Sequence, residues 1–172
     1  MATLIKSKRI AQNPWLLLKA EDAIPANGDV IVPLAVWNGQ REALLARKGR
    51  VGVLLENTDD PRSLVTDFAK LGVIAVRFPK FTDGRAYSIA RLLRRMGWQG
   101  ELRAMGDVLR DQLFFMARCG FDAMLLREDQ NPEVALTAFN DFTVPYQAAI
   151  DRGSRFGGPP AQQPAASAMN PW

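Results

Sequence analysis

The chain has 172 residues, with 22 Lys and Arg against 18 Asp and Glu, one cysteine and no histidine. This length suits one domain with a sizeable core, and a hydrophobic fraction of 48% is ordinary for globular proteins. The lack of histidine excludes Ser-His-Asp triads, Cys-His pairs and histidine-ligated metals. The lone Cys119 excludes an internal disulfide and a cysteine-ligated iron–sulfur cluster. We therefore expect no intrinsic metal, and electron transfer would need a borrowed cofactor or a partner.

Hydropathy and charge along the chain indicate where the protein works. No apolar run approaches the roughly 18 residues that a membrane-spanning helix needs, and residues 1–9 lack the apolar stretch of a signal peptide. The expected compartment is the cytoplasm, with no membrane contact. The net charge of +4 is small, and the basic residues form no aromatic-and-basic motif, so nucleic acid is not an expected partner.

Composition divides the chain into three parts. Residues 1–28 are predicted to form an irregular or short-stranded arm, in which the apolar residues 15–18 pack on the core. Residues 29–150 are the predicted α/β domain. Residues 151–172 contain three glycines and four prolines without hydrophobic periodicity, which is typical of a disordered tail.

Within the central part, apolar runs alternate with amphipathic segments. Continuous apolar runs predict five strands that are buried on both faces, at residues 30–36, 51–55, 73–78, 101–105 and 121–126. Pro33 favours an edge position or a bulge for the first of them. The segments between and after the strands predict helices at residues 40–48, 60–71, 84–96 and 107–120, and a fifth from Asn131 that is interrupted at Pro145. Asp60-Pro61 and Asn131-Pro132 are typical N-cap and first-turn pairs.

Strands that alternate with helices indicate a parallel sheet with right-handed crossovers. The predicted fold class is therefore α/β, with a five-stranded parallel open sheet and flanking helices. We expect a doubly wound, flavodoxin-like arrangement, and the alternative is a barrel-like fragment. Ligands of open parallel sheets bind outside the carboxyl ends of the strands.

Residues 78–88 form the richest of the five loops at those ends. The loop combines Phe78 and Phe81 with the N-terminus of a helix, whose unpaired N–H groups and Arg85 favour an anion such as sulfite or a carboxylate. We predict an anion-favouring pocket at the carboxyl ends of the third and fourth strands, with the ligand-binding residues Asp83, Arg85, Ser88, Arg103, Asp107 and Gln112. The alternative is that Thr82 or Asp83 only caps the helix and that the phenylalanines belong to the core.

Two arginines lie inside apolar runs. A charge in a central strand is costly unless it is paired, so Arg77 and Arg103 either bind an anion or form structural bridges. The bridge is the favoured interpretation, with Glu56, Asp107 or Asp111 as the partner. Asp107 is also the predicted N-cap of its helix. Cys119 is predicted to be a buried structural thiol.

Five short blocks of sequence resemble the bacterial domain of unknown function 934 family. They are residues 81–88, 90–94, 100–104, 106–112 and 120–123, and the resemblance covers about residues 1–143. One departure is Gln12-Asn13-Pro14-Trp15, where we expect an acidic residue shortly before the tryptophan. Members of the family are commonly described as oxidoreductases of sulfite reduction and are encoded beside assimilatory sulfite reductase. The resemblance therefore implies a pathway and a partner, sulfite reductase, but no catalytic residues.

Sulfite reduction itself requires siroheme and an iron–sulfur cluster, which this chain cannot ligate with histidine or several cysteines. The expected function is therefore that of an accessory protein that supports or docks on sulfite reductase. The alternatives are a small oxidoreductase that uses a borrowed nucleotide or flavin cofactor, and an anion-binding or non-redox enzyme.

Overall fold

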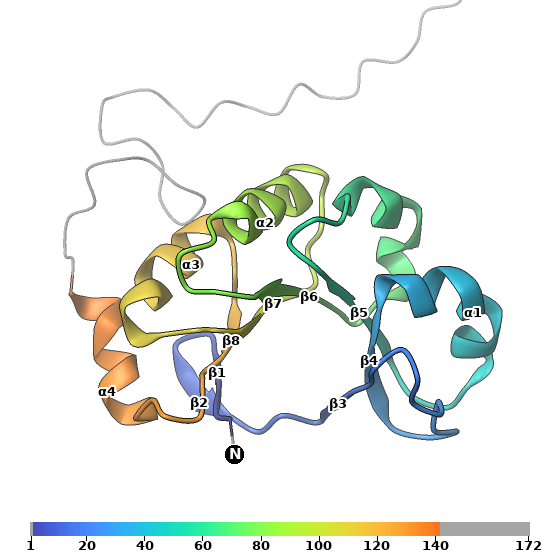
Figure 1. Ribbon diagram of the computed structural model, residues 1–172, viewed down its shortest axis with the longest axis horizontal. Coiled ribbons are helices and arrows are strands. Elements are labelled where there is room, and N and C mark those ends of the chain that lie inside the picture. Colours follow the sequence, from blue (N-terminus) through green and yellow to red (C-terminus); the bar gives the residue numbers. More distant parts are fainter. Residues whose placement is uncertain (1, 142–172) are drawn as a thin grey trace, which may run out of the picture.

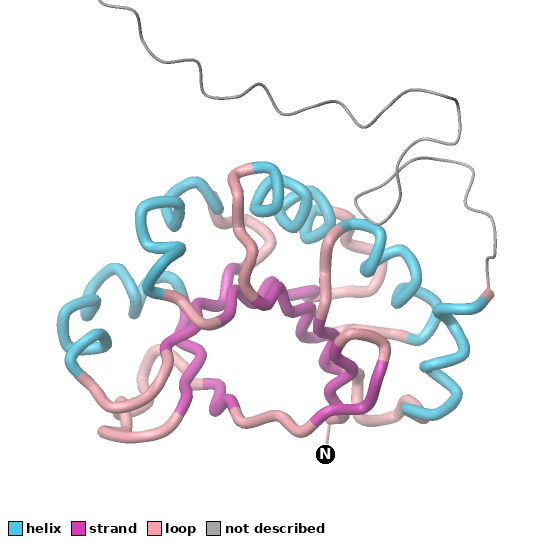
Figure 2. Tube along the Cα trace, turned by 180° about the vertical axis from the view of Figure 1, so that it is seen from behind, coloured by secondary structure: helices cyan, strands magenta, loops and turns pink. Residues whose placement is uncertain are grey.

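The chain forms an α/β structure in which one curled sheet carries its helices on the convex side (Figures 1 and 2). The structure is a computed structural model and describes residues 2–141. The predictions for Pro145 and for residues 151–172 lie outside the described residues. None of the described helices has the length and apolar character that crossing a bilayer demands.

The central five strands are those that the apolar runs predict, and each is parallel to the next. They are β4 (Asp29–Pro33), β5 (Val51–Leu55), β6 (Val73–Phe78), β7 (Glu101–Gly106) and β8 (Ala123–Leu125). The helices that connect and follow them are α1 (Leu34–Ala46), η1 (Pro61–Lys70), α2 (Arg85–Arg95), η2 (Arg110–Gln112), α3 (Leu113–Cys119), α4 (Pro132–Thr137) and η3 (Ala138–Asn140). Because consecutive strands are neighbours in the sheet, the winding never reverses, and the helices lie on one face (Figure 2). The doubly wound expectation is therefore corrected to a half-barrel, which is the barrel-like alternative.

The N-terminal arm extends this sheet at both ends. It contributes β1 (Leu4–Lys6), β2 (Arg9–Ala11) and β3 (Trp15–Leu17). Strand β1 is antiparallel to both β2 and β8, and β3 is parallel to β4. The sheet is thus mixed and has eight strands in the order β2-β1-β8-β7-β6-β5-β4-β3, which replaces the predicted five-stranded parallel sheet. Its two edge strands, β2 and β3, are joined by residues 12–14 across the open side (Figure 2).

Four predicted boundaries are corrected or confirmed by local chemistry. Pro33 ends β4 and stands at the N-cap of α1, so residues 34–36 are helical rather than extended. Asp60 accepts the backbone N–H of Arg62 at 3.0 Å, which confirms the predicted cap. Asn131 likewise accepts the N–H groups of the first turn of α4. Asp107 does not cap a helix, because the helical residues begin only at Arg110.

Both faces of the sheet are apolar. Alternate residues of the strands, such as Val53 and Ile74, pack under the helices in the main core. The residues between them face the concave side and form a smaller cluster of Trp15, Ile31, Leu54, Val73, Ala75 and Met105. Burial on both faces explains the continuous apolar runs in the sequence.

Candidate functional site

The loop between β6 and α2 is fixed at the carboxyl end of the sheet. The N–H of Phe81 donates to Asp107 Oδ2 at 2.8 Å, and Gln112 Nε2 donates to the Phe81 carbonyl at 2.8 Å. Gln112 Oε1 also accepts the N–H of Leu109 at 3.1 Å, so one amide side chain connects two loops. The Phe81 residue itself is 53% exposed. The predicted site residues Asp107 and Gln112 therefore hold the backbone on both sides of a residue whose aromatic side chain is half exposed.

Asp83 organises the other end of the same loop. Its carboxylate accepts three hydrogen bonds, from the backbone N–H of Arg85 at 3.0 Å, from Arg85 Nη2 at 2.7 Å and from the side-chain amide of Asn57 at 2.5 Å. The Arg85 hydrogen bond is the main reason why the pKa of Asp83 lies well below its usual range. Asp83 thus bonds the first residue of α2, although Gly84 and not Asp83 stands at the N-cap, and it also neutralises Arg85.

Five of the six predicted ligand-binding residues lie at or near this end of the sheet. Asp83, Asp107 and Gln112 are bonded to the loop or within it, and Arg85 is paired with Asp83. Ser88 is exposed on α2. Anion binding by these residues stays a prediction.

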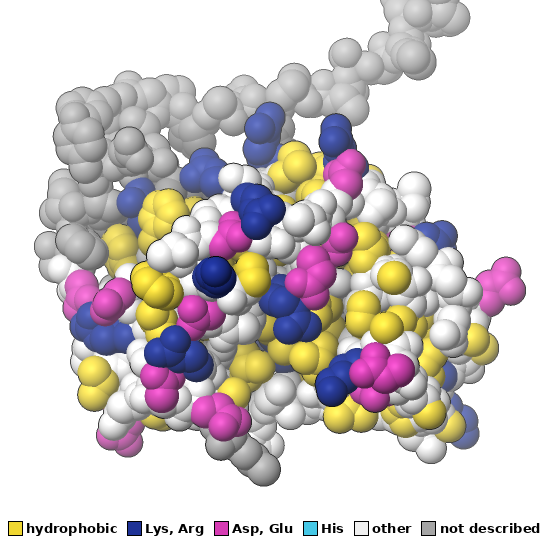
Figure 3. All heavy atoms as spheres, in the orientation of Figure 1, with side chains coloured by type: hydrophobic (Ala, Val, Ile, Leu, Met, Phe, Trp, Pro, Cys, Tyr) yellow, Lys and Arg dark blue, Asp and Glu magenta, His cyan; other side chains and the backbone are white. Residues whose placement is uncertain are grey.

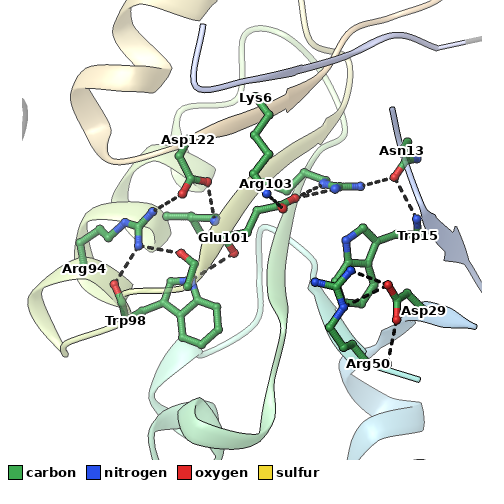
Figure 4. A network of polar contacts seen from close by, with 12 residues as sticks. Lys6, Asn13, Trp15, Asp29, Arg50, Arg94, Trp98, Glu101, Arg103 and Asp122 are labelled. Atoms are coloured by element: carbon green, nitrogen blue, oxygen red, sulfur yellow. Dashed lines mark hydrogen bonds and ion pairs between the residues drawn. The ribbon is translucent and has the colours of Figure 1, made fainter. Parts of the chain in front are cut away.

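Arg103 lies apart from the other five. Its side chain faces the concave side of β7, is 1% exposed, and donates from Nε to Glu101 Oε1 at 2.8 Å (Figure 4). Its Nη1 donates to Asn13 Oδ1 at 2.8 Å, and Lys6 Nζ also contacts Glu101 at 2.8 Å. Arg103 is therefore a structural bridge near the amino ends of the strands. Its partner is Glu101, which replaces the candidates Glu56, Asp107 and Asp111.

The remaining arginines of the carboxyl end are paired as well. Arg77 Nε donates to Glu56 Oε1 at 2.8 Å, which confirms one of the predicted bridges. Arg127 donates to Asp107 at 2.6 Å and to both oxygens of Asp129. The Arg127 hydrogen bond lowers the pKa of Asp129 to about 2.

A pocket of about 270 Å³ opens on the concave side, at the carboxyl ends of β6, β7 and β8. None of the six predicted ligand-binding residues lines this pocket. The residues that line it are Ala2, Leu17, Arg77, Met105, Gly106, Leu125, Leu126, Arg127 and Glu128. The sequence analysis missed this pocket because it assigned no strand to residue 17 and did not separate the two faces of each strand. Alternation along β6 was the available signal, since it places Arg77 on the same face as Val73 and Ala75.

A model of a bacterial family, described as Bacterial protein of unknown function (DUF934), matches residues 52–156. The chain belongs to this family. No curated protein and no solved structure matches it. In this DUF934 protein the match begins in β5, so it includes the loop between β6 and α2 and most of the pocket but not the N-terminal arm. Within residues 2–141, no three His, Cys, Asp or Glu side chains are placed to hold a metal ion.

Proposed function

We propose that this protein is an accessory component of assimilatory sulfite reduction that docks on sulfite reductase. The partner comes from the family resemblance in the sequence. We assign the docking to an aromatic rim, defined as Phe81, Tyr87 and Phe115. The observation that supports this surface is Phe81, a half-exposed phenylalanine whose backbone N–H and carbonyl are both hydrogen-bonded to side chains.

The three aromatic residues of the rim are linked by contacts. The Gln112 side chain that bonds the Phe81 carbonyl also lies near enough to the phenol of Tyr87 to influence its pKa. The Tyr87 ring lies 5.0 Å from that of Phe115, which is 51% exposed. Aromatic side chains are enriched at the centres of protein interfaces because they bury much area at a small entropic cost. A backbone that is already fixed lowers this cost further.

The charges of the rim favour docking over capture of free sulfite. Arg85 is bonded to Asp83, so an oxyanion would have to displace a carboxylate that is held by its own loop. Over the middle and lower parts of the face seen in Figure 3, Lys and Arg side chains lie next to Asp and Glu side chains, whereas the upper edge carries mainly basic side chains. Such alternation suits the polar border of a protein interface better than an anion trap.

The size of the concave pocket disfavours this pocket as the site of a flavin or dinucleotide cofactor. Pockets for drug-sized ligands and cofactors have volumes of about 300–1,000 Å³. The pocket on the concave side has about 270 Å³, which suits a ligand smaller than a flavin or a dinucleotide.

Binding of the full chain to purified sulfite reductase, measured by surface plasmon resonance, tests the proposal. We expect Phe81→Ser and Phe115→Ser each to weaken binding about tenfold, which corresponds to about 1.4 kcal/mol. Val134→Ser is the matched control, because Val134 is 52% exposed but lies on α4. No binding of the unchanged protein, or equal binding of all three variants, would refute the proposed surface.

A further inference from the structure

A second pocket, of about 220 Å³, lies between α3 and the turn that joins β1 to β2. Its walls are mainly apolar and include three phenylalanine rings. The residues that line it are Ser7, Lys8, Phe114, Ala117, Arg118, Phe121, Asp122, Met124 and Phe139. An apolar cavity of about 150 Å³ can hold one benzene molecule, so this pocket suits a single aromatic ring with a short substituent.

Lys8 supplies the charge that a ligand of this pocket can use. The Asp122 carboxylate is already paired with Arg94 at 3.3 Å, and Arg118 has interactions of its own. Lys8, by contrast, makes no hydrogen bond or ion pair within residues 2–141, and its ammonium group lies 5.8 Å from the centroid of the Phe139 ring. A matching ligand therefore carries a negative charge beside its apolar body.

The turn that carries Lys8 has an unfavourable backbone. Ser7 and Lys8 have φ angles of +49° and +62°, which the two-residue turn between β1 and β2 requires. Glycine and asparagine adopt such angles more readily, so serine and lysine cost free energy here. The turn is also held in place, because the Ser7 N–H donates to the Asp122 carbonyl at 2.8 Å. Strained residues are concentrated at binding sites, which supports a role for the Lys8 side chain in binding.

We infer that this pocket binds an aromatic monocarboxylate of about the size of phenylacetate. The ligand ring lies among Phe114, Phe121 and Phe139, since aromatic rings pack favourably with one another. The ligand carboxylate binds the ammonium group of Lys8, which is exposed at the side of the pocket. The pocket shares no residue with the aromatic rim, so the inference does not depend on docking to sulfite reductase.

Calorimetric titration of the full chain separates the features of the ligand. The probes are phenylacetate, 2-phenylacetamide without the charge, 2-phenylethylamine with a positive charge and acetate without the ring. We expect phenylacetate to bind about fivefold more tightly than 2-phenylacetamide, because an exposed ion pair contributes little more than this, and the other two probes to bind more weakly still. The inference is overturned if phenylacetate does not bind in the millimolar range, or if 2-phenylacetamide or 2-phenylethylamine binds as tightly.

Substitution of Lys8 tests the assigned charge. Lys8→Gln should weaken phenylacetate binding about fivefold and leave the binding of 2-phenylacetamide unchanged. Lys48→Gln is the matched control and should change neither, because Lys48 is an exposed lysine that follows α1, far from β1 in the sheet order. No change for phenylacetate in Lys8→Gln, or an equal loss for both ligands, overturns the inference.

Substitution of Ala117 tests the assigned pocket. Ala117→Leu places a larger side chain among the lining residues, so it should abolish the binding of phenylacetate and of 2-phenylacetamide. Thermal melts confirm that each variant is folded, and unchanged binding by a folded Ala117→Leu overturns the inference. Should Ala117→Leu not fold, the methyl NMR signal of Met124 in the unchanged protein decides: no shift on adding phenylacetate overturns the inference.

Discussion

Arg103→Met tests whether the buried ion pair holds the N-terminal arm to the sheet. Arg103 donates hydrogen bonds to Glu101 and to Asn13, and the Glu101 side chain is only 8% exposed. Removing one partner of a buried pair costs about 3–5 kcal/mol, because the other charge stays buried without compensation. Since Glu101 keeps its contact with Lys6, we expect the lower end, a loss of about 3 kcal/mol in the free energy of unfolding.

Urea denaturation followed by circular dichroism measures this loss. With a denaturant slope of about 2 kcal/mol/M, the midpoint should fall by roughly 1.5 M. The double variant Glu101→Gln with Arg103→Met leaves no unpaired buried charge, so it should be more stable than Arg103→Met alone. A loss of less than about 1 kcal/mol for the single variant, or a double variant that is less stable still, would refute the reasoning.

Two further predictions concern a glycine and a tyrosine. Gly106 has φ +103°, and an added Cβ would lie 2.4 Å from the Phe78 carbonyl oxygen, so Gly106→Ala should lower the free energy of unfolding by more than about 1 kcal/mol. Gly39 lies in α1, and a Cβ added there would have no atom within 4 Å, so Gly39→Ala should instead raise the free energy of unfolding by up to about 1 kcal/mol. Equal shifts of the melting temperature in the two variants would contradict this. Burial raises the pKa of Tyr87 to about 12, so the stability from its neutral phenol is complete below pH 10 and is lost as the pH rises through 12. Absorbance titration of phenolate in a Tyr146→Phe background measures it, and a midpoint near 10 would contradict the buried environment.

Local signals in the sequence predicted the elements that depend on neighbouring residues. Asp60 and Asn131 bond N–H groups two or three residues away, so each cap can be read from a few letters. The apolar runs likewise predicted the five central strands, because each is buried on both sides. Pro33 was misplaced within its strand, since an apolar run alone does not show where extended backbone turns into helix.

The parts that the sequence did not predict depend on long-range pairing. Strands of three residues are too short to show a pattern of their own, and β1 joins the main sheet through its pairing with β8, which lies far along the chain. A sheet that is apolar on both faces also does not show on which side its helices lie. This is why a doubly wound sheet and a half-barrel could not be separated.

The candidate site shows the same division. The sequence placed Asp83, Arg85, Asp107 and Gln112 at or near the loop between β6 and α2 because these residues lie close to strand ends in the sequence. Arg103 was misplaced because its bond to Asn13 joins residues 90 positions apart. Asn13 lies in the segment where an acidic residue was expected, and its side-chain oxygen provides the acceptor that Arg103 uses.

The pairing of the N-terminal strand β1 with the last strand, β8, determines the order in which the sheet can form. The central strands pair with strands that follow them directly, whereas Leu4 pairs with Leu125. Closing so long a loop is entropically costly and slow compared with the local pairings. On the ribosome, the N-terminal residues emerge first and β1 can pair with β2, but the pairing of β1 with β8 must wait until β8 has been synthesised. Until then Glu101 and Arg103 remain accessible to water, and their burial marks the final step of assembly.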